Sequence, residues 1–169
     1  MTLESGHRVA MREMSSLRNT SVGSLVGVVL AHPDAAMRAA FTQALAEVEA
    51  KVAVRWFDNG RACLSYLQDL ELPRGEPAPR LVLLGFDLPG LDGMQVLQRL
   101  REGRARRGIP VVMTGKAGDV ARVRPAYQAG ANSCVLLPDD PLQRSINLAT
   151  VVEYWTRVVV GPALEVARG

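Results

Sequence analysis

The chain has 169 residues, a formal net charge of +3 and 48% hydrophobic residues, enough apolar material for one well-buried domain. No apolar run approaches the roughly 20 residues that span a bilayer, and the N-terminus has no apolar segment after its charges. We therefore expect neither a membrane partner nor a secretory signal, and we expect the protein to be cytoplasmic. Cys63 and Cys134 lack metal-binding or disulfide spacing, so they are predicted to be free thiols.

Residues 1–24 are polar and rich in Ser and Gly, which predicts a flexible extension, and Met11 or Met14 is an alternative start. Residues 25–161 are predicted to form the domain, and residues 162–169 a short tail. Within the domain, apolar runs alternate with helical patterns. The predicted strands are Val26–Ala31, Val52–Phe57, Leu81–Leu84, Pro110–Met113 and Ser133–Leu136.

Each predicted helix has a recognisable start. Acidic or amide residues that can accept backbone hydrogen bonds stand before the helical patterns, at Asp34, Asp58 or Asn59, Asp92, and Asp140 before Pro141. Pro125 falls inside the fourth helical pattern, so that helix is expected to begin late, near Arg122 to Arg124. Five βα units predict a doubly wound parallel α/β sheet with functional groups at the carboxyl ends of its strands.

The segment from Leu81 to Gly93 reads LVLLGFDLPGLDG and resembles the phosphoacceptor segment of bacterial response-regulator receiver domains. The rest of the domain resembles the same family through Leu88-Pro89-Gly90, Asp92-Gly93, Gly130-Ala131-Asn132-Ser133 and Pro138. The resemblance implies a five-stranded, flavodoxin-like (CheY-like) fold. In such receivers an acidic pair and an acceptor aspartate hold Mg²⁺, while a Thr or Ser and a lysine stabilise the transferring phosphoryl group.

This sequence departs from the receiver pattern at those chemical positions. Gly85 stands at the acceptor position, and His32 and Pro33 stand where the acidic pair is expected. Gly115 falls on the Thr/Ser position, although a shift of one residue would place Thr114 there, and Leu137 replaces the lysine. We therefore expect no bound metal or cofactor, no catalytic residues and no enzymatic activity. A receiver fold without receiver chemistry is called a pseudo-receiver below.

Other residues leave alternatives open. Asp87, two residues after the acceptor position, is a candidate noncanonical phosphoacceptor for a histidine kinase. His32 could act as a base, but no nucleophile accompanies it at a recognisable spacing. An arginine cluster could bind nucleic acid, yet it has no interleaved aromatic residues, so a solvated surface and no nucleic-acid partner are expected. The cluster comprises Arg99, Arg101, Arg104, Arg106 and Arg107.

The last helical pattern carries two apolar stripes on roughly opposite sides. One contains Leu142, Ile146 and Ala149; the other contains Leu148, Val151, Trp155, Val158 and Val159, with Tyr154 beside it. One sheet face needs one stripe, so the second, around Trp155, is predicted to be a protein interface, with a homodimer as the leading arrangement.

The ending Val151–Trp155 also resembles the extended last helix of single-domain response regulators that serve phytochrome-type histidine kinases, a subgroup that pairs through this region. The resemblance implies a protein partner such as a histidine kinase or another signalling protein. The sequence as a whole thus predicts a bacterial signalling or scaffold protein that acts by phosphorylation-independent protein binding.

Overall fold

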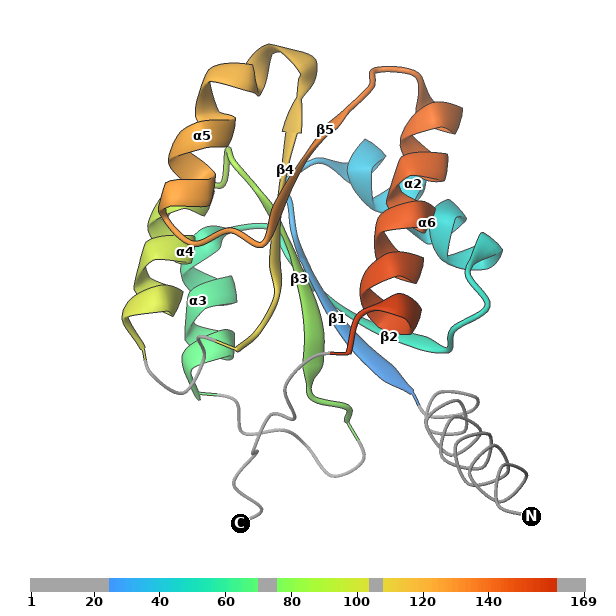
Figure 1. Cartoon of the computed structure of the whole chain (residues 1–169), viewed down its shortest axis with the longest axis horizontal. Coiled ribbons are helices and arrows are strands. Elements are labelled where there is room, and N and C mark those ends of the chain that lie inside the picture. The colour runs from blue at the N-terminus through green and yellow to red at the C-terminus, as the bar shows by residue number, and fades with distance from the viewer. Residues whose placement is uncertain (1–24, 70–75, 104–107, 161–169) are drawn as a thin grey trace, which may run out of the picture.

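Five parallel strands form one sheet in the order β2-β1-β3-β4-β5 (Figure 1). The computed structural model describes residues 25–69, 76–103 and 108–160, so the predicted extension 1–24 and tail 162–169 lie outside the described residues. The strands are β1 (Val26–Ala31), β2 (Val52–Phe57), β3 (Pro79–Gly85), β4 (Val111–Lys116) and β5 (Ser133–Leu137). All five predicted strands are confirmed, with β3, β4 and β5 extending further than the apolar runs indicated.

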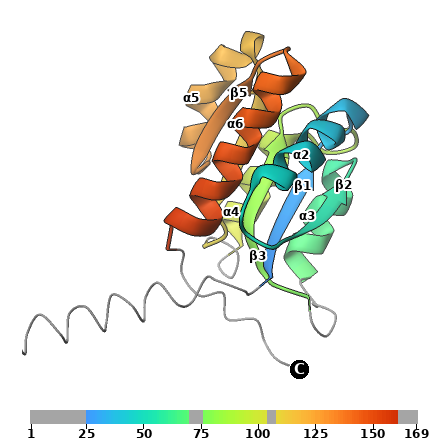
Figure 2. The same cartoon turned by 90° about the vertical axis from the view of Figure 1, so that its right-hand side faces the viewer.

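Helices cover both faces of the sheet. Figures 1 and 2 show α2 and α6 together on one face and α3, α4 and α5 on the other. Their bounds are α2 (Ala35–Glu47), α3 (Gly60–Asp69), α4 (Gly93–Glu102), α5 (Val120–Gln128) and α6 (Pro141–Glu153), with the short turns η2 (Ala117–Asp119) and η3 (Tyr154–Val158). None of these helices, within the described ranges, is long and apolar enough to cross a bilayer.

The sheet separates two hydrophobic cores. Phe41 of α2 and Leu148 of α6 are fully buried with Leu30 and Leu83 on one face. Leu97 of α4 and Phe86 belong to the core on the other face. Because β1 and β3 lie inside the sheet with helices on both sides, their residues must be apolar on both faces, which accounts for their uninterrupted Val and Leu runs.

The predicted helix starts are confirmed by hydrogen bonds. The Asp34 carboxylate accepts from the backbone N–H of Ala36 at 2.8 Å, and Asp140 accepts from Gln143 N–H at 2.7 Å. Asp92 and Gln95 form a reciprocal capping box at the start of α4. At the start of α3, the side chain that accepts a backbone N–H, that of Ala62, belongs to Asn59. These bonds satisfy donors that an uncapped helix end would leave unpaired.

The expected late start of α5 is wrong. The helix begins at Val120 and contains Pro125, directly after the 3₁₀ turn η2. The Asp119 carboxylate accepts from the backbone N–H of Lys116 at 2.7 Å and closes that turn. The closed turn leads straight into the helix, and Pro125 removes one intrahelical donor without preventing it.

The two stripes of α6 face opposite to the prediction. Leu148 is 0% exposed and belongs to the core, so its assignment to an interface stripe is wrong. Val151 and Trp155 are half-buried against the same core, and Val159 is also half-buried. The exposed large hydrophobic side chains of α6 and η3 are Leu142, Ile146, Tyr154 and Val158. Because α6 packs beside α2 as well as on the sheet, the Leu148 side supplies the core and the Leu142 side remains outside.

Candidate functional site

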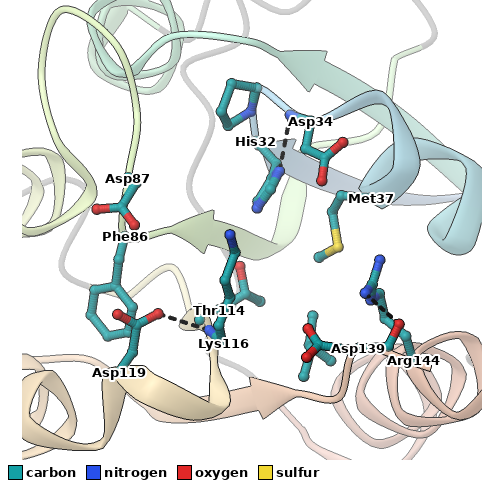
Figure 3. Close-up of a pocket in the computed structure, with 13 residues that line it drawn as sticks. His32, Asp34, Met37, Phe86, Asp87, Thr114, Lys116, Asp119, Asp139 and Arg144 are labelled. Carbon is teal, nitrogen blue, oxygen red and sulfur yellow. Dashed lines mark hydrogen bonds between the residues drawn. The ribbon is translucent and has the colours of Figure 1, made fainter. Parts of the chain in front are cut away.

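A pocket lies at the carboxyl ends of the strands, where the loops after β1, β3, β4 and β5 meet (Figure 3). Its volume is ≈ 200 Å³, space for a small molecule or for several waters. His32, Phe86, Thr114 and Lys116 line it, together with Arg144 of α6. The sequence placed the functional groups at this edge of the sheet, and the structure brings His32, Pro33, Gly115 and Leu137 to the same pocket.

The side chain of His32 occupies the space beside Gly85. A Cβ built on Gly85 would lie 2.9 Å from Cδ2 of the imidazole and 3.6 Å from Nε2. The first of these distances is shorter than the contacts that Cβ atoms make in proteins, so any side chain at position 85 would require the ring to move. Thus the two departures from the receiver pattern, at the ends of the adjacent strands β1 and β3, fit each other in space.

Thr114 lies directly opposite Gly85 in the β3–β4 register. Its side chain lines the pocket, its residue is only 2% exposed, and its Oγ1 has no hydrogen-bond partner among the described residues. The position beside the acceptor site therefore belongs to Thr114, and the assignment of Gly115 to that position is corrected. The one-residue ambiguity arose because β4 ends three residues later than its apolar run.

A cation reaches the pocket from β4 instead of β5. Leu137, at the position of the receiver lysine, is 7% exposed and also lines the pocket. Lys116 is its direct partner in the β4–β5 register, and its side chain points into the pocket in Figure 3. Lys116 was not predicted as a pocket residue. Its position two residues after Thr114, at the end of a strand, is the sequence signal that would have indicated it.

Arg144 was also not predicted as a pocket residue, because its position within a helix does not indicate that it lies at the strand ends. Its Nε donates to the carbonyl of Pro138 at 3.0 Å, and its Nη2 donates to the carbonyl of Asp139 at 2.9 Å. These bonds hold the guanidinium beside the loop that follows β5, at the edge of the pocket (Figure 3).

Three of the four aspartate side chains that line the pocket already accept hydrogen bonds, the fourth being Asp139. Asp34 caps α2, and Asp119 accepts from Lys116 N–H. Asp87, the candidate alternative phosphoacceptor, forms an ion pair with Arg122 at 2.7 Å, and its side chain is 79% exposed. Across the described ranges, no group of three or more His, Cys, Asp or Glu side chains is arranged to hold a metal ion.

The tautomer of His32 follows from its hydrogen bond. The backbone N–H of Asp34 donates to Nδ1 at 3.1 Å, so in the neutral ring the proton is on Nε2. Burial lowers the pKa of His32 below its ordinary value, against a smaller opposing effect of Asp34. The neutral ring presents Nε2–H as a donor and carries no charge to compete with Lys116.

One member of the arginine cluster has a structural role. The guanidinium of Arg101 donates to the carbonyls of Gly130 and Ile109 and to Oδ1 of Asn132. These bonds tie α4 to the loops that precede β4 and β5. Arg104, Arg106 and Arg107 lie outside the described residues, and Arg99 is exposed.

The strand order and the pocket at the strand ends are those of a receiver domain. The sequence profile of the response regulator receiver domain matches residues 28–144. The chain therefore belongs to the response-regulator receiver family, and the predicted flavodoxin-like fold is confirmed.

Among individual relatives, the chain is 34% identical over 104 residues to the probable methanogenesis regulatory protein FilR2 of Methanothrix harundinacea, covering 60% of this chain and 65% of that protein. It is 28% identical to the response regulator Rcp1 of Synechocystis, covering 62% and 71%. The crystal structure of Mn²⁺-bound Rcp1 superposes with a TM-score of 0.73 at 21% identity, over 82% of this chain and 99% of that one. The phosphorylated cyanobacterial phytochrome response regulator RcpA gives 0.75 at 21% identity, over 83% and 100%.

Proposed function

We propose that this protein is a pseudo-receiver, a signalling or scaffold module that acts through phosphorylation-independent protein binding. The observation that carries the proposal is the pairing of His32 with Gly85. Gly85 has no carboxylate to phosphorylate, and the imidazole stands in the space that an acceptor side chain would need. A phosphoryl group at this position has neither an atom to bond to nor room to be added.

The loss of Mg²⁺ ligands supports the same proposal. Transfer of a phosphoryl group needs a divalent ion to neutralise the developing charge, and carboxylate oxygens are its usual ligands. Here His32 and Pro33 follow β1, and one carboxylate oxygen of Asp34 already accepts a hydrogen bond from the N–H of Ala36. The relative Rcp1 has been crystallised with Mn²⁺ bound, and RcpA has been crystallised in a phosphorylated form.

Protein binding is proposed for the outward side of α6 and η3. Leu142, Ile146, Tyr154 and Val158 are between 49% and 66% exposed, and with Gln43 and Glu47 of α2 they line a groove between the two helices. Apolar side chains on one surface strip favour burial against another protein, at about 25 cal/mol per Å² of apolar area removed from water. We propose a second copy of the chain as the occupant, with a histidine kinase or other signalling protein as the alternative partner.

Of the interface residues predicted from the sequence, Tyr154 and Val158 remain in this proposal. Val151, Trp155 and Val159 are half-buried, and Leu148 is removed. The ring of Tyr154 packs edge-on against Trp155 at 5.5 Å, so the core side of η3 supports the exposed aromatic side chain. An aromatic residue held rigid in this way loses little entropy on binding.

Sedimentation of the full chain tests the interface. Ile146→Glu is expected to convert a dimer into a folded monomer, because it places a charge in the apolar strip. Gln98→Glu, at an exposed position of α4 on the other side of the sheet, is the matched control and should leave the dimer intact. A wild type that sediments as a monomer at high micromolar concentration would reject a second copy of the chain as the occupant of this surface.

A further inference from the structure

The side chain of Arg122, in the first turn of α5, reaches the loop that follows β3. Its Nη1 forms ion pairs with Asp87 at 2.7 Å and with Asp119 at 3.4 Å. Its guanidinium carbon lies 4.4 Å from the centre of the Phe86 ring, within the range of a cation–π contact. One side chain thus joins the end of β3 to η2 and α5, although Asp87 and Arg122 are 35 residues apart in the sequence.

Gly115 of β4 leaves the space in which these groups meet. A Cβ built on Gly115 would lie 2.8 Å from Oδ2 of Asp119 and 2.8 Å from Cδ2 of Phe86. Such contacts are essentially never made by Cβ atoms in proteins, so a side chain at this position would displace the ring or the carboxylate. The cluster of Phe86, Asp87, Asp119 and Arg122, called the Arg122 latch below, therefore depends on glycine at position 115.

The contacts of the Arg122 latch differ in strength. The side chain of Asp87 is 79% exposed, and exposed ion pairs contribute little to stability. The side chain of Asp119 is 18% exposed and also accepts from the backbone N–H of Lys116 at 2.7 Å, so a second bond holds it in place. Phe86 is 1% exposed, and a cation–π contact is stronger when the groups are shielded from water. Phe86 and Asp119 are therefore the main anchors of the arginine.

The other end of α5 is also held by side-chain hydrogen bonds. The hydroxyl of Tyr127 accepts from the backbone N–H of Cys134 in β5 at 3.2 Å. Just after the helix, the carbonyl of Gly130 accepts from Nε of Arg101 in α4 at 2.8 Å. Within α5 itself, Ala126 is the one buried residue. The position of this helix therefore depends more on its polar contacts than on hydrophobic packing.

We propose that the Arg122 latch is a conformational device that holds η2 and α5 in a single position. A helix with few buried apolar contacts has low local stability unless other contacts hold it. The latch supplies those contacts from groups of the chain itself, so no ligand and no modification is needed to fix the helix. The proposal goes beyond the protein-binding function above, because it concerns α5 and not the apolar strip on α6 and η3.

Native-state hydrogen exchange of the full chain, followed by ¹H–¹⁵N NMR, tests the proposal. Arg122→Met removes the ion pairs and the cation–π contact, so it should accelerate exchange of the amides of residues 117–124 about three- to tenfold. Amides in the last turn of α2, on the opposite face of the sheet, open without breaking the latch and should keep their rates. Unchanged rates in residues 117–124, or an equal acceleration in α2, overturn the proposal.

Matched variants separate the latch from a general effect of charge. Arg124→Met is the control, because Arg124 is exposed in the same helix and makes no ion pair within the ranges that the structure describes. Gly115→Ala should accelerate the same amides as Arg122→Met while keeping every charge, because the added methyl group displaces the ring or the carboxylate. Arg122→Lys keeps the charge but not the flat guanidinium and should give an intermediate acceleration, which covers the case in which the methionine variant fails to fold. Equal acceleration by Arg124→Met overturns the proposal.

Relaxation dispersion of the wild-type amides tests the single position directly. Flat profiles are expected across residues 117–128, because the latched helix has no second conformation to exchange with on the millisecond timescale. Millisecond exchange at these residues in the wild type overturns the proposal. Neither result bears on the sedimentation or phosphorylation experiments, since those concern the α6 surface and position 85.

Discussion

The imidazole of His32 and the α-carbon of Gly85 lie at the ends of neighbouring strands, with no room for a side chain between them. A Cβ on Gly85 would approach Cδ2 of the ring to 2.9 Å, and it would also lie 3.3 Å from the carbonyl oxygen of Ala31. The ring is held by the hydrogen bond from Asp34 N–H to Nδ1. The absence of a side chain at position 85 and the placement of the His32 ring are thus one packing arrangement.

A double-mutant cycle measures this relationship. Gly85→Ala is expected to lower the free energy of unfolding by about 1–3 kcal/mol, the usual cost of overpacking a well-filled site. In a His32→Ala background the same substitution should cost much less, because the methyl group then enters the vacated space. Urea denaturation of the four proteins gives the coupling energy. Equal costs in the two backgrounds would show that the ring does not fill the space at Gly85.

The free energy of unfolding should decrease as the pH is lowered through a window set by His32. Burial keeps the pKa of His32 below its ordinary value of 6.5. As the pH drops below 6.5, the unfolded chain binds a proton that the folded protein does not, so the free energy of unfolding decreases until the pH passes the folded pKa. Above that window the ring is neutral in both states and contributes nothing to the pH dependence.

Urea denaturation between about pH 5 and 7 should show this decrease in the wild type and a smaller one in His32→Gln. An NMR titration of the imidazole supplies the control, with His7 as the other histidine of the sequence. A His32 ring that titrates at or above its ordinary pKa would contradict the expected sign.

Arg101 should affect stability rather than nucleic-acid binding. Arg101→Met would leave the carbonyls of Gly130 and Ile109 without their side-chain donor, and it should lower the free energy of unfolding by about 2–3 kcal/mol. Arg99→Met, at an exposed position two residues earlier, is the control and should change stability by less than about 0.5 kcal/mol. Thermal or urea unfolding compares the two. Similar small effects from both variants would mean that the Arg101 network contributes little.

Sequence patterns predicted the scaffold because its signals are local. Continuous Val and Leu runs gave β1 and β3, and the capping side chains of Asp34, Asp92 and Asp140 gave three helix starts. The sequence predicted where the pocket lies but not how its side chains are arranged. That His32 fills the space at Gly85, and that Lys116 lies opposite Leu137, depends on strand register and side-chain direction across different strands.

The orientation of α6 could not be predicted from periodicity. Both stripes are apolar, and a helical pattern alone does not say which one faces the sheet. The chain also leaves regular α-helical geometry at η3, where the N–H of Val159 bonds to the carbonyl of Tyr154, five residues back. A constant 100° per residue therefore fails for Val158 and Val159, which the sequence had placed on the same stripe as Leu148.

Intact mass spectrometry of the full chain, after incubation with acetyl phosphate and Mg²⁺, tests the central claim most directly. The account predicts no stable phosphoryl adduct, because Gly85 supplies no carboxylate and the β1 end supplies no acidic pair. A receiver with an intact acidic pocket, treated in parallel, shows that the phosphodonor is active. A stoichiometric adduct on the wild type that is lost in Asp87→Asn would contradict the account and identify Asp87 as a phosphoacceptor.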